Sequence, residues 1–319
     1  MKKKIVLTLF LIISLSGLLM GCNGNNSPSK DETMDNKIKV VATLFPQYDF
    51  TRQIAGDKAE VTLLMSPGVE SHSYEPSPSD IIKINGSDLF IYTGKFMEPW
   101  AQSIIDGIEN KNVKILDVSQ NVSLDKSEEH EDEEEHREAD HAAHEFDPHI
   151  WTSPVNAKIM VENILRDLCE LDPENADYYK KNAENYLSEL TDLDKEFKDI
   201  FETSKRNEII FAGKFALHYF AEEYGMEYEA AFDSCSTETE PSVKVIAELI
   251  DEIKEENIPV VYYPELTDPK VARSISDETG AEMLILHSCH NLSKDELKSG
   301  ATYLSLMKKN AENLKIGLN

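Results

Sequence analysis

"ENADYYKKNAENYLSELTDLDKEFKDIFETS", residues 174–204, is the longest uninterrupted helical pattern in the chain, and the rest of the fold is arranged around it. It follows Asp172-Pro173 and contains neither proline nor glycine, so nothing in it interrupts a helix. Its apolar side chains recur at helical spacing: Tyr179, Ala183, Tyr186, Leu190, Leu193 and Phe197. The spacing predicts one long amphipathic helix, and the segments on its two sides show what it joins.

Short apolar, β-branched segments precede and follow this helix, with helix-like segments between them. The expected strands before it are 38–45, 59–65, 87–94 and 112–118. Those after it are 208–213, 226–232, 258–266 and 281–286. Strands that alternate with helices indicate parallel sheets with crossover helices. We therefore expect an α/β protein with two lobes, each a mostly parallel sheet flanked by helices, joined by one long rigid helix.

The N-terminus predicts export. Residues 1–21 carry three lysines and then an apolar run that is typical of a signal peptide. Leu19-Met20-Gly21-Cys22 resembles the bacterial lipobox, in which the cysteine is lipidated, although a plain signal peptide with an incidental Cys22 is the alternative. Two acyl chains give stable membrane attachment. We expect an extracytoplasmic lipoprotein, anchored through Cys22 to the outer face of the bacterial cell membrane.

These segments divide the chain into expected parts. A signal peptide (1–21) and a polar, lipidated tether (22–37) come first. An N-terminal lobe (38–172) with an acidic, histidine-rich loop (125–146), a linking helix (173–205) and a C-terminal lobe (206–319) follow. Beyond the signal, no stretch approaches the ~18 apolar residues of a spanning helix.

The charge excludes one class of partner. The 319 residues have a formal net charge of −28, which becomes −31 when the three signal-peptide lysines are removed. Binding nucleic acid needs clustered lysine and arginine, so we expect no nucleic-acid partner. A cationic ligand suits the negative electrostatic field of such a chain, although most of the charge serves solubility.

Four histidines follow predicted strands or stand beside helix starts: His72, His149, His218 and His290. Open α/β sheets bind ligands at the carboxyl ends of their strands, so these four side chains can converge there. Any one of them alone is better explained as a structural or surface histidine, whereas four at such positions favour a metal site. No Gly-rich phosphate loop, GxSxG elbow or HExxH motif is present.

Four motifs carry a resemblance to a known family: "PGVESHSYEPSPSD" (67–80), "MEPW" (97–100), "DPHIWTSPVNAK" (147–158) and "GATYLSLMKKNAENL" (300–314). They resemble the metal-binding lipoproteins of zinc and manganese ABC importers, the cluster A-I substrate-binding proteins. The resemblance runs from about residue 38 to the C-terminus. It implies a metal site in the cleft between the lobes, capture of a divalent transition metal, delivery to a membrane ABC permease, and no enzymatic activity.

The resemblance places His72 and His149 on the two ligand positions of the N-terminal lobe. In the C-terminal lobe, Lys214 stands where the family commonly has His or Glu, and His218 lies one helical turn further on. His290 stands where the family often has an Asp. Glu265 matches a family glutamate near the cleft, either as an outer-shell residue or as a replacement ligand.

The expected metal is zinc. Imidazole ligands favour Zn²⁺, whereas oxygen-rich sites suit Mn²⁺, which we therefore rank below zinc. Copper and nickel stay open as alternatives. A tetrahedral set of four imidazoles would bind Zn²⁺ at about 2.0–2.1 Å.

The histidine-rich loop and the cysteines carry secondary predictions. His130, His136, His141 and His144 lie in an acidic tract, which the resemblance and the composition predict to be a weak zinc collector. The alternative is a solvated charge run. Outside the cell a Cys235–Cys289 disulfide is expected, with thiolate ligation of a metal as its rival.

Two other functions compete with transport. A zinc hydrolase would need an open ligand position for water and a nearby base, which four imidazoles do not leave. Surface adhesion leaves no readable motif and can coexist with transport. We expect a monomer.

Overall fold

The structure, a computed structural model, describes residues 37–69, 74–126, 146–232 and 241–319. Within them lie two four-stranded sheets whose pairings are all parallel, with orders β2-β1-β3-β4 and β6-β5-β7-β8. The first comprises β1 (Ile38–Ala42), β2 (Ala59–Leu63), β3 (Leu89–Tyr92) and β4 (Lys114–Asp117). The second comprises β5 (Glu208–Lys214), β6 (Glu227–Phe232), β7 (Val260–Tyr263) and β8 (Glu282–Ile285). Each strand falls in a predicted segment, except that β5 extends one residue beyond segment 208–213, so the predicted α/β class is confirmed.

Helices connect successive strands, as parallel pairing requires. In the first half the connecting helices are α2 (Phe45–Ala55), α3 (Pro78–Asn85) and α4 (Ala101–Gly107), and α5 (Pro154–Leu171) follows the last strand. In the second half they are α7 (His218–Tyr224), α8 (Val243–Glu256) and α9 (Lys270–Thr279), and α10 (Lys294–Ser299) and α11 (Tyr303–Gly317) follow the last strand. Short 3₁₀ turns occupy Gly56–Lys58, Ile150–Thr152 and Pro173–Asn175. Among the described residues, no helix combines the length and the apolar character that crossing a membrane requires.

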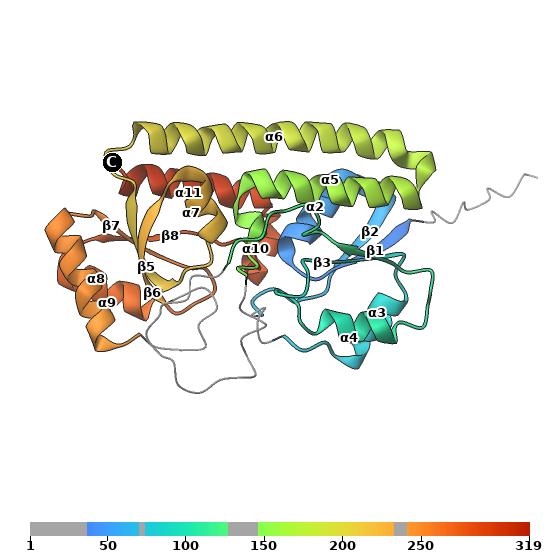
Figure 1. Cartoon of the computed structure of the whole chain (residues 1–319), viewed down its shortest axis with the longest axis horizontal. Helices are drawn as coiled ribbons and strands as arrows, with labels where there is room; N and C mark the ends of the chain where they lie inside the picture. Colours follow the sequence, from blue (N-terminus) through green and yellow to red (C-terminus); the bar gives the residue numbers. More distant parts are fainter. Residues whose placement is uncertain (1–36, 70–73, 127–145, 233–240) are drawn as a thin grey trace, which may run out of the picture. The chain divides into compact units, whose positions relative to one another are not determined.

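The long helix α6 (Ala176–Thr203) has 28 residues, which corresponds to about 42 Å at the usual rise per residue. The six side chains that predicted it are all buried. It packs on α5 and α2 of the first half and on α11 and α7 of the second, and Figure 1 shows it lying over α5 and α11. The predicted linking helix is therefore confirmed, with a first turn that is 3₁₀.

Side-chain caps explain why several helices begin where they do. Ser153 accepts hydrogen bonds from the N–H groups of Val155 and Asn156 at the start of α5, and Pro154 occupies the first helical position. Ser77 and Asp80 form a reciprocal capping box on α3. Such caps satisfy main-chain donors that a helix start leaves unpaired. The cap of α5 thereby fixes where the segment carrying His149 enters the helix.

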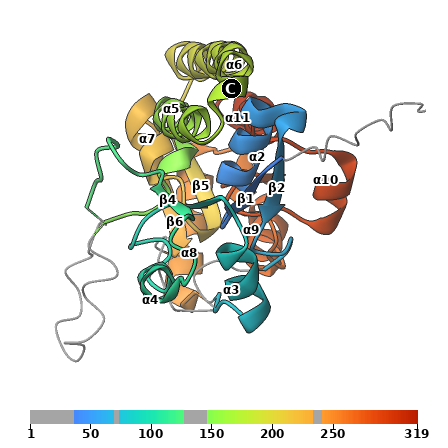
Figure 2. The same ribbon diagram turned by 90° about the vertical axis from the view of Figure 1, so that its right-hand side faces the viewer.

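The hydrophobic core is continuous across the two halves. One cluster of buried side chains joins β1, α2 and α5 to α6 and continues through α7, β7 and α11. Two smaller clusters lie on the opposite faces of the sheets, one under α3 and α4 and one under α8 and α9. Figure 2 shows α3, α4, α8 and α9 on the side of the strands away from α5, α6 and α11. The shared core makes α6 part of both halves.

A buried glutamate lies beside the carboxyl ends of β1 and β3. Glu98 is 1% exposed, and its Oε2 accepts the N–H of Thr93 at 2.9 Å. Its Oε1 contacts the hydroxyl of Thr43, which also lies 2.9 Å from Oε1 of Gln47. The Thr43 hydroxyl can donate its one proton to only one of these two oxygens. When it donates to Gln47, a proton on Glu98 completes the second hydrogen bond, and the Thr43 oxygen accepts it. Burial raises the pKa of Glu98 from 4.5 to about 8, against the opposing hydrogen bonds.

Replacing Glu98 by glutamine is expected to remove a pH dependence of stability. Because the folded pKa is raised, the contribution of Glu98 is fully present below about pH 4.5 and is lost as the pH rises through about 8. Glu98→Gln should match the wild type at pH 5 and exceed its unfolding free energy by about 2–4 kcal/mol at pH 9. Denaturant unfolding at both pH values measures the difference.

The matched control is Glu109→Gln, since Glu109 is an exposed residue of the same half. Its unfolding free energy should follow the wild type at both pH values. A Glu98→Gln variant that is no more stable than the wild type at pH 9 would show that the folded pKa of Glu98 is not raised.

Candidate metal centre

The segment 146–152 holds a histidine in a defined orientation. His149 is 2% exposed, its N–H donates to Oδ1 of Asp147 at 2.8 Å, and its Nδ1 lies 2.9 Å from the same oxygen. A carboxylate can only accept, so Nδ1 carries the proton and the lone pair of the ring lies on Nε2. A carboxylate behind an imidazole is the arrangement that orients histidine ligands and raises their basicity at metal sites.

The main chain around His149 is held as firmly as its ring. The hydroxyl and N–H of Thr152 donate to the carbonyl oxygen of His149 at 2.8 and 3.1 Å. Pro148 restricts the preceding residue, and the ring of Trp151 packs against the imidazole with centroids 5.5 Å apart. His149 therefore has little freedom to turn.

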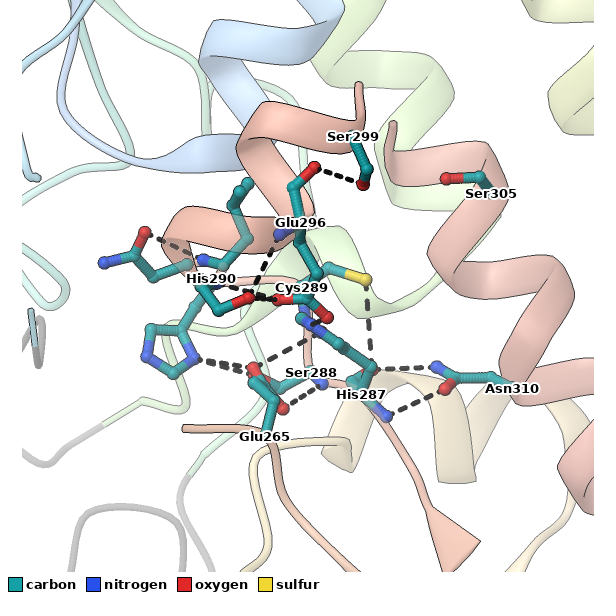
Figure 3. A network of polar contacts seen from close by, with 12 residues as sticks. Glu265, His287, Ser288, Cys289, His290, Glu296, Ser299, Ser305 and Asn310 are labelled. Atoms are coloured by element: carbon teal, nitrogen blue, oxygen red, sulfur yellow. Dashed lines mark hydrogen bonds and ion pairs between the residues drawn. The ribbon is translucent and has the colours of Figure 1, made fainter. Parts of the chain in front are cut away.

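A second histidine is oriented in the same way in the loop after β8. Figure 3 shows Glu265, Ser288 and His290 joined by hydrogen bonds. The Ser288 hydroxyl donates to Oε1 of Glu265 at 2.6 Å, and Nδ1 of His290 lies 2.7 Å from the same hydroxyl. Because the only hydroxyl proton points to the carboxylate, Nδ1 of His290 donates to the hydroxyl. The lone pair of His290 then lies on Nε2, as in His149.

Glu265 itself is buried and fully engaged. Its Oε2 accepts the N–H of Ser288 at 2.9 Å, while Oε1 accepts the Ser288 hydroxyl and lies 3.3 Å from Nδ1 of His290. Burial alone would raise the pKa of Glu265, but the imidazoles of His287 and His290 and the Ser288 hydrogen bonds outweigh it and hold the pKa well below its usual range. The carboxyl is therefore an anion that supports the loop.

Direct contacts bring the two histidine-bearing segments together. The indole N–H of Trp151 donates to the carbonyl oxygen of Ser288 at 2.8 Å, across 137 positions of sequence. The hydroxyl of Tyr303, in α11, donates to the carbonyl oxygen of Trp151 at 2.7 Å. The first residue of α2, Phe45, donates its N–H to the carbonyl oxygen of His290 at 3.3 Å. His149 and His290 thus belong to adjoining segments contributed by different halves.

His218 and Lys214 occupy neighbouring places in the second half. His218 is the first residue of α7, and its Nε2 lies 4.0 Å from Oδ2 of Asp125. Lys214 ends β5, where the pairing with β6 shifts register, and it is exposed. The structure thus places His218 beside the first half of the chain, next to Asp125.

The ligand set predicted from the sequence stays a prediction. Within residues 37–69, 74–126, 146–232 and 241–319, no group of three or more His, Cys, Asp and Glu side chains is arranged so that it could hold a metal ion. Several residues of the predictions lie outside these ranges: His72, His130, His136, His141, His144, Cys22 and Cys235. Cys289 is buried, and its predicted pairing with Cys235 stays untested.

Three residues that shape these histidines were missed by the sequence reasoning. Asp147 stands two positions before His149, and this Asp-Pro-His spacing is the signal that could have identified it. Ser288 has the same spacing to His290. His287 is buried, accepts the N–H of Cys289 on Nδ1 at 2.8 Å, and presents Nε2 to Oε1 of Glu296 at 3.7 Å.

Residues 40–317 match the family described as "Zinc-uptake complex component A periplasmic". The "High-affinity zinc uptake system protein ZnuA" of Bacillus subtilis is 35% identical over 310 residues, which cover 97% of each chain. The "Zinc-binding lipoprotein AdcA" of Streptococcus pneumoniae is 34% identical over 314 residues, which cover 98% of this chain and 60% of that protein. The chain thus spans only part of the length of this second relative.

A similar fold has been solved with its metal. The crystal structure of the Zn(II)-bound ZnuA-like domain of Streptococcus pneumoniae AdcA superposes with a TM-score of 0.73 at 32% identity. The match covers 88% of this chain and 99% of that domain. The two-lobe architecture is therefore shared with a zinc-bound protein.

Proposed function

The chain belongs to the family of the periplasmic zinc-uptake component A, and on that premise we propose that it captures Zn²⁺ outside the cell membrane and delivers it to an ABC permease. Zinc is the cargo, and no bond is made or broken. The observation that carries the proposal is the pairing of His149 with Asp147, since a buried imidazole backed by a carboxylate is built to bind a metal through Nε2.

The proposed ligands are His72, His149, His218 and His290. The orientation of His290 by Ser288 supports its inclusion, because the lone pair lies on Nε2 as in His149. Four neutral imidazoles suit tetrahedral Zn²⁺ better than Mn²⁺, which prefers oxygen ligands. Both oxygens of Glu265 are engaged by Ser288, so we assign Glu265 to the outer shell rather than to the ligand set.

The setting of the protein is part of the proposal. We propose that residues 1–21 direct export, that Cys22 is lipidated, and that residues 22–37 tether a monomeric body to the outer face of the membrane. Residues 38–172 and 206–319 would form the lobes and 173–205 the linking helix. The histidines of the acidic insert would collect zinc weakly.

Equilibrium titration with zinc, in competition with a chelator of known affinity, tests this function. One tightly bound zinc per chain is expected, with manganese bound more weakly. A hydrolysis assay on the same samples addresses the rival enzyme, since zinc-dependent turnover would contradict a role limited to transport. A chain that releases its zinc to a weak chelator would contradict capture itself.

Replacing Glu265 by glutamine is expected to weaken zinc binding about 10- to 100-fold, the usual effect of removing an outer-shell partner. The N–H and the hydroxyl of Ser288 each donate to one oxygen of Glu265. The amide of glutamine replaces one of these oxygens with a donor, so the orientation of His290 is lost. Competition titration measures the affinity. Because the buried change can also destabilise the fold, circular dichroism of the metal-free variant accompanies it.

The control for this variant is Glu282→Gln, an exposed glutamate of β8 in the same half. It should leave zinc affinity unchanged. A folded Glu265→Gln variant with wild-type affinity would remove Glu265 from the site.

A further inference from the structure

The two ends of the acidic insert are joined at its base. Lys126 and Phe146 form an isolated antiparallel bridge, and the N–H of Asp147 donates to the carbonyl oxygen of Asp125 at 3.0 Å. We call residues 125–126 and 146–147 the neck. The ring of Phe146 also packs on Phe96, with centroids 5.1 Å apart, which fixes the neck to the first half of the chain.

A side chain from the second half fastens both strands of the neck. The hydroxyl of Tyr219, in α7, donates to the carbonyl oxygen of Asp147 at 2.8 Å and accepts the N–H of Asp125 at 3.0 Å. Tyr219 is 4% exposed, so both of its hydrogen bonds to the neck are shielded from water. Each neck strand therefore makes a hydrogen bond to the same atom of the opposite half.

The neck leads directly to the proposed zinc site. The residue whose carbonyl oxygen binds Tyr219 is Asp147, and its carboxylate orients Nδ1 of His149 at 2.9 Å. On the other side, His218 precedes Tyr219, and its Nε2 lies 4.0 Å from the carboxylate of Asp125. Two proposed ligands from different halves thus stand next to the residues that this hydroxyl joins.

We propose that Tyr219 is a positioning residue for zinc, which couples the contact between the halves to the orientation of His149 through Asp147. The inference rests on the proposed function. While the halves are in contact, the hydroxyl holds the main chain of Asp147, and the carboxylate of Asp147 holds His149. Movement of α7 away from the neck breaks both hydrogen bonds at once, releases Asp147, and favours release of the metal.

Tyr219→Phe tests this with almost no change in volume. The expected result is zinc dissociation about tenfold faster than in the wild type, the lower end of the effect of losing an outer-shell partner. The matched control is Tyr224→Phe on the same helix. Tyr224 is also buried, and its hydroxyl donates to Asp194 of α6 at 3.0 Å, away from the neck. It should change the dissociation rate by less than about twofold, although it too loses a buried hydrogen bond.

A double-mutant cycle separates positioning from general stabilisation. If Tyr219 acts through the Asp147 carboxylate, Tyr219→Phe should have no further effect on zinc dissociation in an Asp147→Ala background. Amide hydrogen exchange of metal-free protein gives a second measure, because the His149 N–H donates to that carboxylate and should exchange faster in Tyr219→Phe than in Tyr224→Phe.

Three outcomes would overturn the inference. Equal dissociation rates in Tyr219→Phe and Tyr224→Phe would make Tyr219 an ordinary structural contact. Independent, additive effects of Tyr219→Phe and Asp147→Ala would exclude action through Asp147. A wild-type chain that retains no zinc would overturn the proposed function itself, and Tyr219 would then only join the halves.

Discussion

Replacing His149 by alanine is expected to weaken zinc binding by about 100- to 1,000-fold. Four-ligand zinc sites in small domains bind with about 10–16 kcal/mol, so one ligand accounts for about 2.5–4 kcal/mol. Each 1.4 kcal/mol corresponds to a tenfold change in affinity. His149 should be at the upper end, because it is buried and held by Asp147 before any metal arrives. Chelator competition at fixed pH measures the loss.

A second variant distinguishes the loss of the ligand from the loss of the residue that orients it. Asp147→Asn keeps the shape but replaces the anionic acceptor behind Nδ1, and it should weaken zinc binding about 10- to 100-fold. Glu162→Ala, at an exposed position of α5, is the control and should bind zinc like the wild type. If His149→Ala keeps both the stoichiometry and the affinity of the wild type, His149 is not a ligand.

Replacing Phe197 by alanine is expected to lower the free energy of unfolding by about 3–5 kcal/mol, the usual cost of emptying an aromatic site in a core. Phe197 is fully buried on α6, with its ring 4.7 Å from that of Phe220 and 5.3 Å from that of Tyr224. Because the core is continuous along α6, both halves should unfold in one transition at a lower midpoint. Thermal unfolding by circular dichroism and by tryptophan fluorescence measures this.

Lys195→Ala is the matched control on the exposed side of the same helix, and it should shift the unfolding free energy by no more than about 0.5 kcal/mol. Two separate transitions in Phe197→Ala, one with the wild-type midpoint, would show that the halves are stabilised independently and that α6 does not join their cores.

The architecture was predictable because its signals are local. The six apolar residues that predicted a helix in segment 174–204 are all buried in α6, together with Asp194 and Ile200. Each of the eight apolar segments forms a strand, since parallel strands buried on both faces read as continuous apolar runs. The 3₁₀ turn at Pro173–Asn175 was not predicted, because a helical spacing does not distinguish the first turn of an α-helix from a 3₁₀ turn.

The site was predictable only in part. The position of His149 beside a predicted helix start singled it out, and the structure shows it buried and oriented. The orienting roles of Asp147 and Ser288 went unnoticed, although each stands two residues from its histidine. Glu265 was expected near the site and lies beside His290. No pattern in the sequence indicated the role of Tyr219, because a buried tyrosine near a helix start usually only packs in the core.

The sequence by itself determined which segments become strands and helices, since hydrophobic periodicity within each segment selects the face to be buried. The contacts of Tyr219 with Asp147, 72 positions away, and of Trp151 with Ser288, 137 positions away, arise from the three-dimensional packing. Those partners are chosen by the packing of whole layers around a common core, and a hydrogen bond forms only when both atoms arrive within about 3 Å with the right geometry. Local spacing carries no information about such meetings, which is why the protonated nitrogen of each histidine could be assigned only from the fold.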